Sequence, residues 1–89
     1  MDDELKFLVF EIFPNPNNGV FSLNFELFTV EDVEIKIYNK LGQLVYNISD
    51  EDVKTGAYEF NLRDLADGIY YVNVKTETAS VTEKILINQ

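Results

Sequence analysis

The chain has 89 residues, of which 46% are hydrophobic, and a formal net charge of −9. This size suits one domain spanning residues 1–89, and the acidic excess makes nucleic acid and an anionic membrane surface poor partners. The sequence has no cysteine and no histidine, which excludes disulfides, Ser-His-Asp or Cys-His catalysis, and zinc sites built from those residues.

The chain begins with the acidic run Met1-Asp2-Asp3-Glu4, whereas a secretory signal peptide begins with a basic region. We therefore expect a domain cut from a larger protein, with residues 1–4 belonging to a linker or added for expression. No apolar run approaches the roughly 20 residues that a membrane span needs, so we expect no membrane insertion. The stretch from Leu5 to Phe13 is apolar on both faces and favours a strand whose register stays open.

A rigid corner follows at residues 13–19. Pro14 and Pro16 each fix φ and remove an amide donor, and the residues before them are pushed toward extended geometry. Asn18-Gly19 supplies the positive φ angles that a tight reversal needs. This segment holds no nucleophile, base or metal-ligand set, which indicates a structural role.

Apolar and polar residues then alternate with the period of two that is typical of half-buried strands. The turns between them are predicted at Gly42, over the polar stretch 49–55, and over 64–68, where Gly68 opens the next strand. The fold class that this spacing predicts is all-β, a two-layer antiparallel immunoglobulin-like sandwich of about seven strands without a long helix. The predicted strands are 5–13, 21–27, 33–37, 44–48, 58–62, 68–74 and 81–87, and the predicted core includes Val33, Ile35, Ile37, Tyr70, Val72 and Val74.

Two groups of acidic residues are weighed as calcium ligands, residues 50–52 and the pair Asp64 and Asp67. Neither has the alternating ligand spacing of a calcium loop, so solubility is the simpler explanation. Glu51 and Asp64 could form a carboxylate pair of the kind that glycoside hydrolases use. Such pairs arise by chance in an acidic chain, and a sandwich of this size offers little cleft. We expect no enzyme activity and no cofactor.

Tyr38, Tyr46 and Tyr71 fall opposite the predicted core positions of their strands. They either pack across the sheet or form an exposed surface on which sugars could stack. An adhesion or carbohydrate-binding module is therefore kept as an alternative function, and a structural spacer domain as a third.

Four segments, in order, resemble the C-terminal sorting domains of type IX secretion cargo. Phe13 to Leu23 is similar to the family's opening (Y/F)PNPxxG motif, with phenylalanine where tyrosine is usual. Val33 to Val45 is similar to its strand, glycine turn and strand, and Leu65 to Val72 to its L-x-x-G-x-Y-x-V element. Lys84 to Ile87 is similar to its terminal lysine-plus-apolar motif.

The resemblance implies a non-catalytic signal that carries a larger exported protein through the periplasm and across the outer membrane. The implied partners are the type IX translocon, its shuttle proteins, and a surface sortase-like peptidase that commonly removes the domain. The implied destination is the cell surface or the medium. The motif residues are Pro14, Asn15, Pro16, Gly19, Gly42, Gly68, Tyr70, Lys84, Ile85, Leu86 and Ile87. Lys84 would provide charge specificity beside an apolar Leu86, on a sheet edge or an exposed last strand that a receptor could pair with.

Overall fold

The computed structural model describes residues 6–89, which form five β-strands and no α-helix. The linker expected at residues 1–4, and the predicted start of the first strand at Leu5, lie outside the described residues. The strands are β1 (Phe7–Phe13), β2 (Val20–Asn39), β3 (Leu44–Asn61), β4 (Gly68–Lys75) and β5 (Ser80–Ile87). All neighbouring strands pair antiparallel, so the all-β prediction is confirmed.

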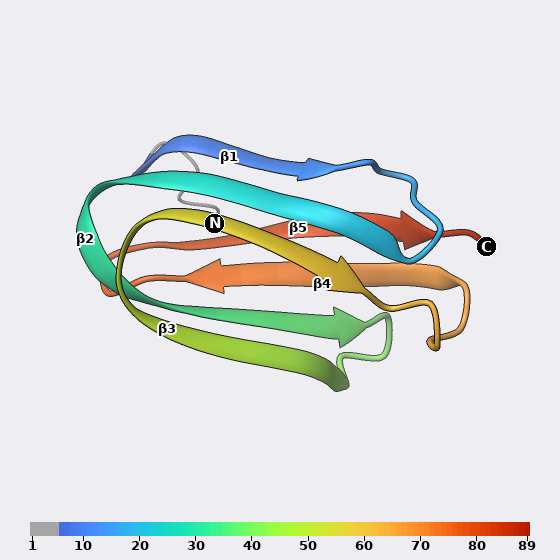
Figure 1. Cartoon of the computed structure of the whole chain (residues 1–89). Coiled ribbons are helices and arrows are strands. Elements are labelled where there is room, and N and C mark those ends of the chain that lie inside the picture. Colours follow the sequence, from blue (N-terminus) through green and yellow to red (C-terminus); the bar gives the residue numbers. More distant parts are fainter. Residues whose placement is uncertain (1–5) are drawn as a thin grey trace.

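The five strands form one curled sheet, a half-barrel (Figure 1). β2 and β3 are long and bend back together at one end of the molecule. The first half of β2 lies between β1 and the second half of β3, and its second half lies between the first half of β3 and β4. β5 then pairs with β4. The two halves of the sheet face each other across the interior.

The prediction of about seven strands in two sheets is wrong in its count and its connectivity. The segments predicted at 21–27 and 33–37 are parts of one strand, β2, and those at 44–48 and 58–62 are largely parts of β3. The polar stretch 49–55, predicted as a loop, continues β3 through the bend. Irregular pairing between Glu26 and Val33 allows β2 to turn there without ending, so the sheet folds over without a break.

The core lies between the two halves of the sheet. Alternate residues of β2, β4 and β5 are buried, as the period-two pattern predicts. The prediction of the core is confirmed, because all six residues named from the sequence are buried: Val33, Ile35, Ile37, Tyr70, Val72 and Val74.

A row of aromatic rings fills the interior under the first half of β2 and the second half of β3. The Tyr58 ring stacks on Phe25 and Phe60, with ring centroids 5.9 and 6.4 Å apart. Phe25 pairs across the strands with Gly56, and a Cβ at position 56 would overlap the Phe25 ring. The absence of a side chain at Gly56 therefore gives this ring its place in the core.

Candidate recognition site

The four segments that carry motifs meet at one end of the molecule, opposite the bend in β2 and β3. Figure 1 shows the β1–β2 connection, the β2–β3 turn, the β3–β4 loop and the chain's C-terminus together at this end. Antiparallel pairing produces this arrangement, since β1, the second half of β2 and β5 all run toward it. Motifs separated by tens of residues in sequence thus form one continuous region.

Asn15 and Asn17 hold the outer edge of β5. The Asn15 side chain donates to the Lys84 carbonyl oxygen at 3.0 Å and accepts from the Leu86 amide at 3.0 Å. The Asn17 amide donates to the Leu86 carbonyl oxygen at 3.0 Å, and the Asn88 amide donates to the Asn17 carbonyl oxygen at 2.8 Å. We call residues 14–17 the asparagine clamp, because they satisfy edge groups of β5 as a neighbouring strand would.

The clamp is held in place by local contacts around Asn17, which is only 6% exposed. The Asn17 side chain donates to the Pro14 carbonyl oxygen at 3.2 Å and accepts from the Gly19 amide at 2.8 Å. Gly19 has φ +104°, and its carbonyl oxygen accepts from the Leu62 amide at 2.7 Å. The prediction that Pro14, Pro16 and Gly19 form a corner is consistent with this geometry.

The β3–β4 loop holds the chain's last residue. The Gln89 side chain donates to the Leu65 carbonyl oxygen at 3.0 Å, and the Gln89 amide donates to the Asp67 carboxylate at 3.2 Å. Gly68, with φ +146°, starts β4 opposite Ile87. The buried Tyr70 places its hydroxyl 2.6 Å from the Ala66 carbonyl oxygen, to which it donates. Gly68 and Tyr70 therefore shape the loop that receives the C-terminus.

Gly42 has φ +83° in the β2–β3 turn, and its amide donates to the Asn39 carbonyl oxygen at 3.0 Å. The Asn39 side chain accepts from the Leu41 and Gln43 amides, which closes the turn. The turn and the β3–β4 loop line a shallow hollow between them. Gly42 therefore allows the backbone conformation that the turn requires.

The terminal motif divides between the interior and the surface. Ile85 and Ile87 are almost fully buried, whereas Lys84 is exposed and Leu86 is 40% exposed. Lys84 and Leu86 border a shallow surface hollow that Asn15 and Ile69 also line. Of the motif residues, these two side chains are the ones on the terminal strand that a partner could contact.

The three tyrosines considered as a binding surface lie on two different faces. Tyr38 and Tyr71 are opposite each other on the outer face of β2 and β4. Tyr46 is 42% exposed but lies opposite the buried Ile37, and its ring contacts Phe60 edge-on, with centroids 5.4 Å apart. Tyr46 therefore lies at the mouth of the half-barrel, exposed as expected from the sequence but on the same face as Ile37 and not on that of Tyr38 and Tyr71.

The two acidic groups weighed from the sequence lie in separate parts of the fold. Within residues 6–89, no group of three or more carboxylates is placed to hold a metal ion. Glu51 lies in the bent part of β3, and Asp64 lies in the loop at the opposite end of the molecule (Figure 1). The two carboxylates therefore cannot act on one glycosidic bond. The same part of the chain forms no helix long and apolar enough to cross a bilayer.

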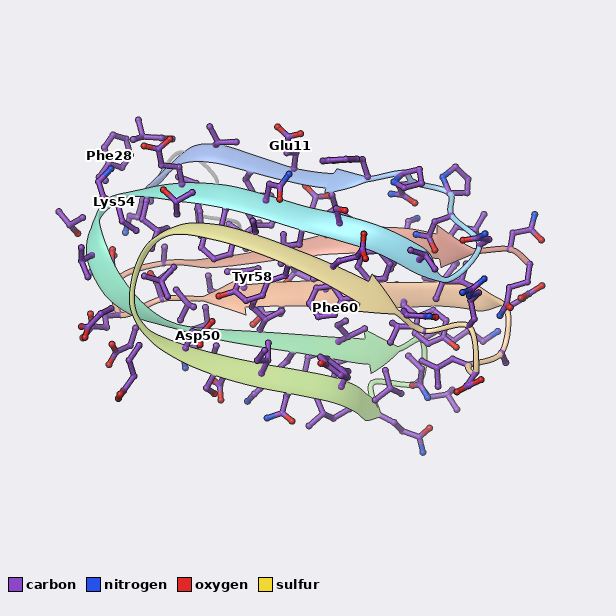
Figure 2. The ribbon with its side chains drawn as sticks, in the orientation of Figure 1. Glu11, Phe28, Asp50, Lys54, Tyr58 and Phe60 are labelled. Carbon is purple, nitrogen blue, oxygen red and sulfur yellow. The ribbon has the colours of Figure 1, made fainter. Side chains whose placement is uncertain are left out.

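One polar contact joins the two arms of β3 across its bend. The Tyr58 hydroxyl donates to the Asp50 carboxylate at 2.7 Å. Figure 2 shows Tyr58 and Phe60 on the upper arm of β3, with Asp50 on the lower arm. Burial, followed by the hydrogen bond and the negative charge of Asp50, raises the pKa of the Tyr58 phenol well above its usual value near 10.

A model of the family described as "Secretion system C-terminal sorting domain" matches residues 11–88. The chain belongs to this family. No match is found among curated proteins. The sorting domain is thus the type IX C-terminal signal of a secreted cargo protein, non-catalytic in itself, which the type IX machinery recognises for passage across the outer membrane.

Two features of the sorting domain escaped the sequence analysis. Asn17 was read as part of a turn, although it is buried and links that turn to β5. The Tyr58–Asp50 contact depends on the bend in β3, which was predicted as a loop. The repeated asparagines at 15, 17 and 18 were the available signal, because asparagine side chains commonly bond to nearby backbone.

Proposed function

We propose that the sorting domain is read at its motif-bearing end, where Lys84 and Leu86 face outward on a clamped terminal strand. The translocon and its shuttle proteins contact this end in the periplasm. A surface sortase-like peptidase then removes the domain, and the cargo stays at the surface or enters the medium. Gly68 and the buried motif residues Tyr70, Ile85 and Ile87 maintain the shape that presents the two exposed side chains.

This proposal rests on the hydrogen bonds between the opening motif, in residues 14–17, and the terminal motif, in residues 84–87. Asn15 and Asn17 bond to the Lys84 carbonyl oxygen and to both backbone polar groups of Leu86 at the edge of β5. Pairing of a receptor strand with this part of the β5 edge would therefore compete with the clamp. Recognition through side chains requires no such displacement, which favours Lys84 and Leu86 as the contacts.

The test is export of a reporter carrying residues 5–89 at its C-terminus, behind a signal peptide, in a bacterium with the type IX system. The intact fusion is expected at the surface or in the medium. Deleting residues 84–89 removes half of β5 and is expected to leave the reporter in the periplasm. Retention of the intact fusion, in a strain that exports a known sorting domain, would contradict the proposed function.

Lys84→Ala separates recognition from folding. Because Lys84 is exposed, the variant is expected to melt like the parent but to be exported poorly. Lys54→Ala is the matched control, since Lys54 is also an exposed strand lysine but lies near the bend. Equal export of the two variants would remove Lys84 from the recognition site.

The adhesion module remains the alternative for the exposed tyrosines. It is supported by the adjacent positions of Tyr38 and Tyr71 on one face. It predicts that the isolated domain binds glycans and that Tyr71→Ala abolishes this binding. A glycan array measures both. Sorting activity requires no such binding.

A further inference from the structure

The outer face of β2, β4 and β5 gathers lysines in an otherwise acidic chain. We call this surface the lysine face, and define it by Lys36, Tyr38, Tyr71, Asn73, Lys75 and Lys84. These residues alternate with buried core residues along the three strands, so their side chains point away from the interior. The face lies on the half of the sheet that includes the terminal strand.

Strand register places these residues in successive rows. Tyr38 pairs with Tyr71, which pairs with Lys84. In the next row Lys36 pairs with Asn73, and in the third Glu34 pairs with Lys75. The rows border a shallow hollow of about 460 Å³ across the sheet. Charged and aromatic side chains therefore lie side by side on the outer face of the sheet.

The centre of the face is held by hydrogen bonds. The Asn73 side chain donates to the Ser80 hydroxyl at 3.0 Å and to the Thr82 hydroxyl at 2.9 Å. Lys36 lies 3.5 Å from the Glu34 carboxylate in an exposed ion pair. Because β4 and β5 are locked together here, a partner would meet a surface that needs little ordering.

The charge of the face opposes that of the whole domain. Its three lysines have one neighbouring carboxylate in these rows, Glu34, and the other carboxylates near Lys75 line a separate hollow at the end of the face: Asp32, Asp50, Glu51 and Glu77. All other positions of the sequence hold four basic and fifteen acidic residues. An acidic partner would be repelled by the other surfaces and attracted here, so the charge distribution selects an orientation as well as a site.

We propose that the lysine face is the docking surface for a carboxylate-rich protein surface of the export machinery. The inference rests on the proposed function and extends the site from Lys84 to Lys36 and Lys75. The two tyrosines supply apolar area and hydroxyl groups between the charges, as interface aromatics do. A second copy of this chain fits less well, since two molecules of charge −9 repel each other.

The first test reverses a charge on the lysine face and measures the rate at which the reporter fusion is exported. Lys36→Glu is expected to lower the initial export rate about tenfold, the factor that 1.4 kcal/mol of lost binding gives. Lys54→Glu is the matched control, because Lys54 also forms an exposed ion pair, at 3.3 Å with Glu26, away from the face. Lys36→Arg keeps the charge and is expected to export normally. Thermal melts are the check that all three variants fold.

A second measurement uses the purified chain and does not depend on export. Hexaglutamate peptide is titrated against the labelled domain by NMR, and shifts are expected for the amides of Lys36, Asn73 and Lys84. Added salt is expected to reverse them. Failure of the intact fusion to be exported would contradict the proposed function, whereas this titration still tests the face.

Three results would overturn the docking surface. One is normal export of Lys36→Glu, and another is the absence of hexaglutamate shifts on the face. The third is a different occupant. Sedimentation showing a dimer that Lys36→Glu dissociates would assign the face to a second copy, and glycan binding lost in Tyr71→Ala would assign it to a sugar.

Discussion

Gly19 shows how strongly a single backbone position is constrained in this domain. Its φ of +104° is one that residues with a side chain rarely adopt. A Cβ there would also lie 2.9 Å from Cγ and 3.0 Å from Cα of Arg63, so the loop after β3 would have to shift. Both effects act two residues after the asparagine clamp, at the residue whose amide bonds to the Asn17 side chain.

We therefore expect Gly19→Ala to lower the free energy of unfolding by about 1 kcal/mol or more. Urea denaturation followed by circular dichroism measures the change. Gly42→Ala is the comparison, because its φ is also positive but no atom lies within 4 Å of its added Cβ. A Gly19→Ala variant less affected than Gly42→Ala would contradict the role of Arg63.

Tyr58 gives the stability of the domain a specific dependence on alkaline pH. Its pKa is raised by folding, so the folded protein holds the phenolic proton more tightly than the unfolded chain does. The stabilisation that comes from this tighter proton binding is fully present below about pH 10, the pKa of tyrosine in the unfolded chain. It is lost progressively as the pH rises from there toward the higher pKa of the folded state.

Tyr58→Phe is expected to flatten the fall in stability above about pH 10, because phenylalanine has no proton to lose. At neutral pH the same variant is expected to be less stable, since the Asp50 carboxylate loses its hydrogen-bond donor. Denaturation midpoints across pH 7–11 measure both effects. Tyr71→Phe, on the exposed outer face, serves as the control. Parallel pH profiles for the parent and Tyr58→Phe would contradict the argument.

At the scale of elements, the asparagine clamp and β5 stabilise each other. Asn15→Ala removes both side-chain bonds to β5. We expect the Leu86 amide to exchange with solvent about tenfold faster, consistent with a lost hydrogen bond of about 1 kcal/mol. Asn18→Ala is the matched control, because the Asn18 side chain bonds only locally, accepting from the Val20 amide at 3.2 Å. Equal exchange in the two variants would show that Asn15 does not hold the strand.

The central position of β2 and β4 makes their buried residues the most sensitive to truncation. Ile35 and Val72 are fully buried in adjacent strands. Replacing either with alanine is expected to cost about 1–5 kcal/mol, through lost burial and the cavity left behind. Chemical denaturation measures the loss. Little change in either variant would contradict the assignment of these residues to the core.

At the scale of the whole molecule, the sequence predicted the all-β class and the core, because alternation of apolar residues reports directly on burial. It did not predict the joining of strands into β2 and β3. The polar residues 49–55 look like a loop, yet they continue β3 with interrupted pairing to β2. Polar side chains are compatible with a strand there because the outer face of a curled sheet is exposed to water. Gly56 was overlooked for a related reason, since its role depends on the Phe25 ring across the strands.

The candidate site was predicted as a set of motifs but not as a contact between them. The exposure of Lys84 and Leu86, on which their proposed roles rest, could be predicted from their alternation with the apolar Ile85 and Ile87. Bonding of Asn15 and Asn17 to β5 spans about 70 residues of sequence and includes only one isolated bridge, between Asn17 and Ile87, outside the named strands. Periodicity carries no information about such a contact.

The direction of β1 and β5 has a mechanical consequence. Both strands run from the bend toward the motif-bearing end, and the cargo of a C-terminal sorting domain precedes β1 (Figure 1). Tension between the cargo and a machine gripping the end of β5 would act along the strand axes. The hydrogen bonds between β1 and β2 would then be loaded in shear. They would resist the force together and would not open one after another. Strand direction therefore predicts that the domain would resist extension while its cargo is pulled.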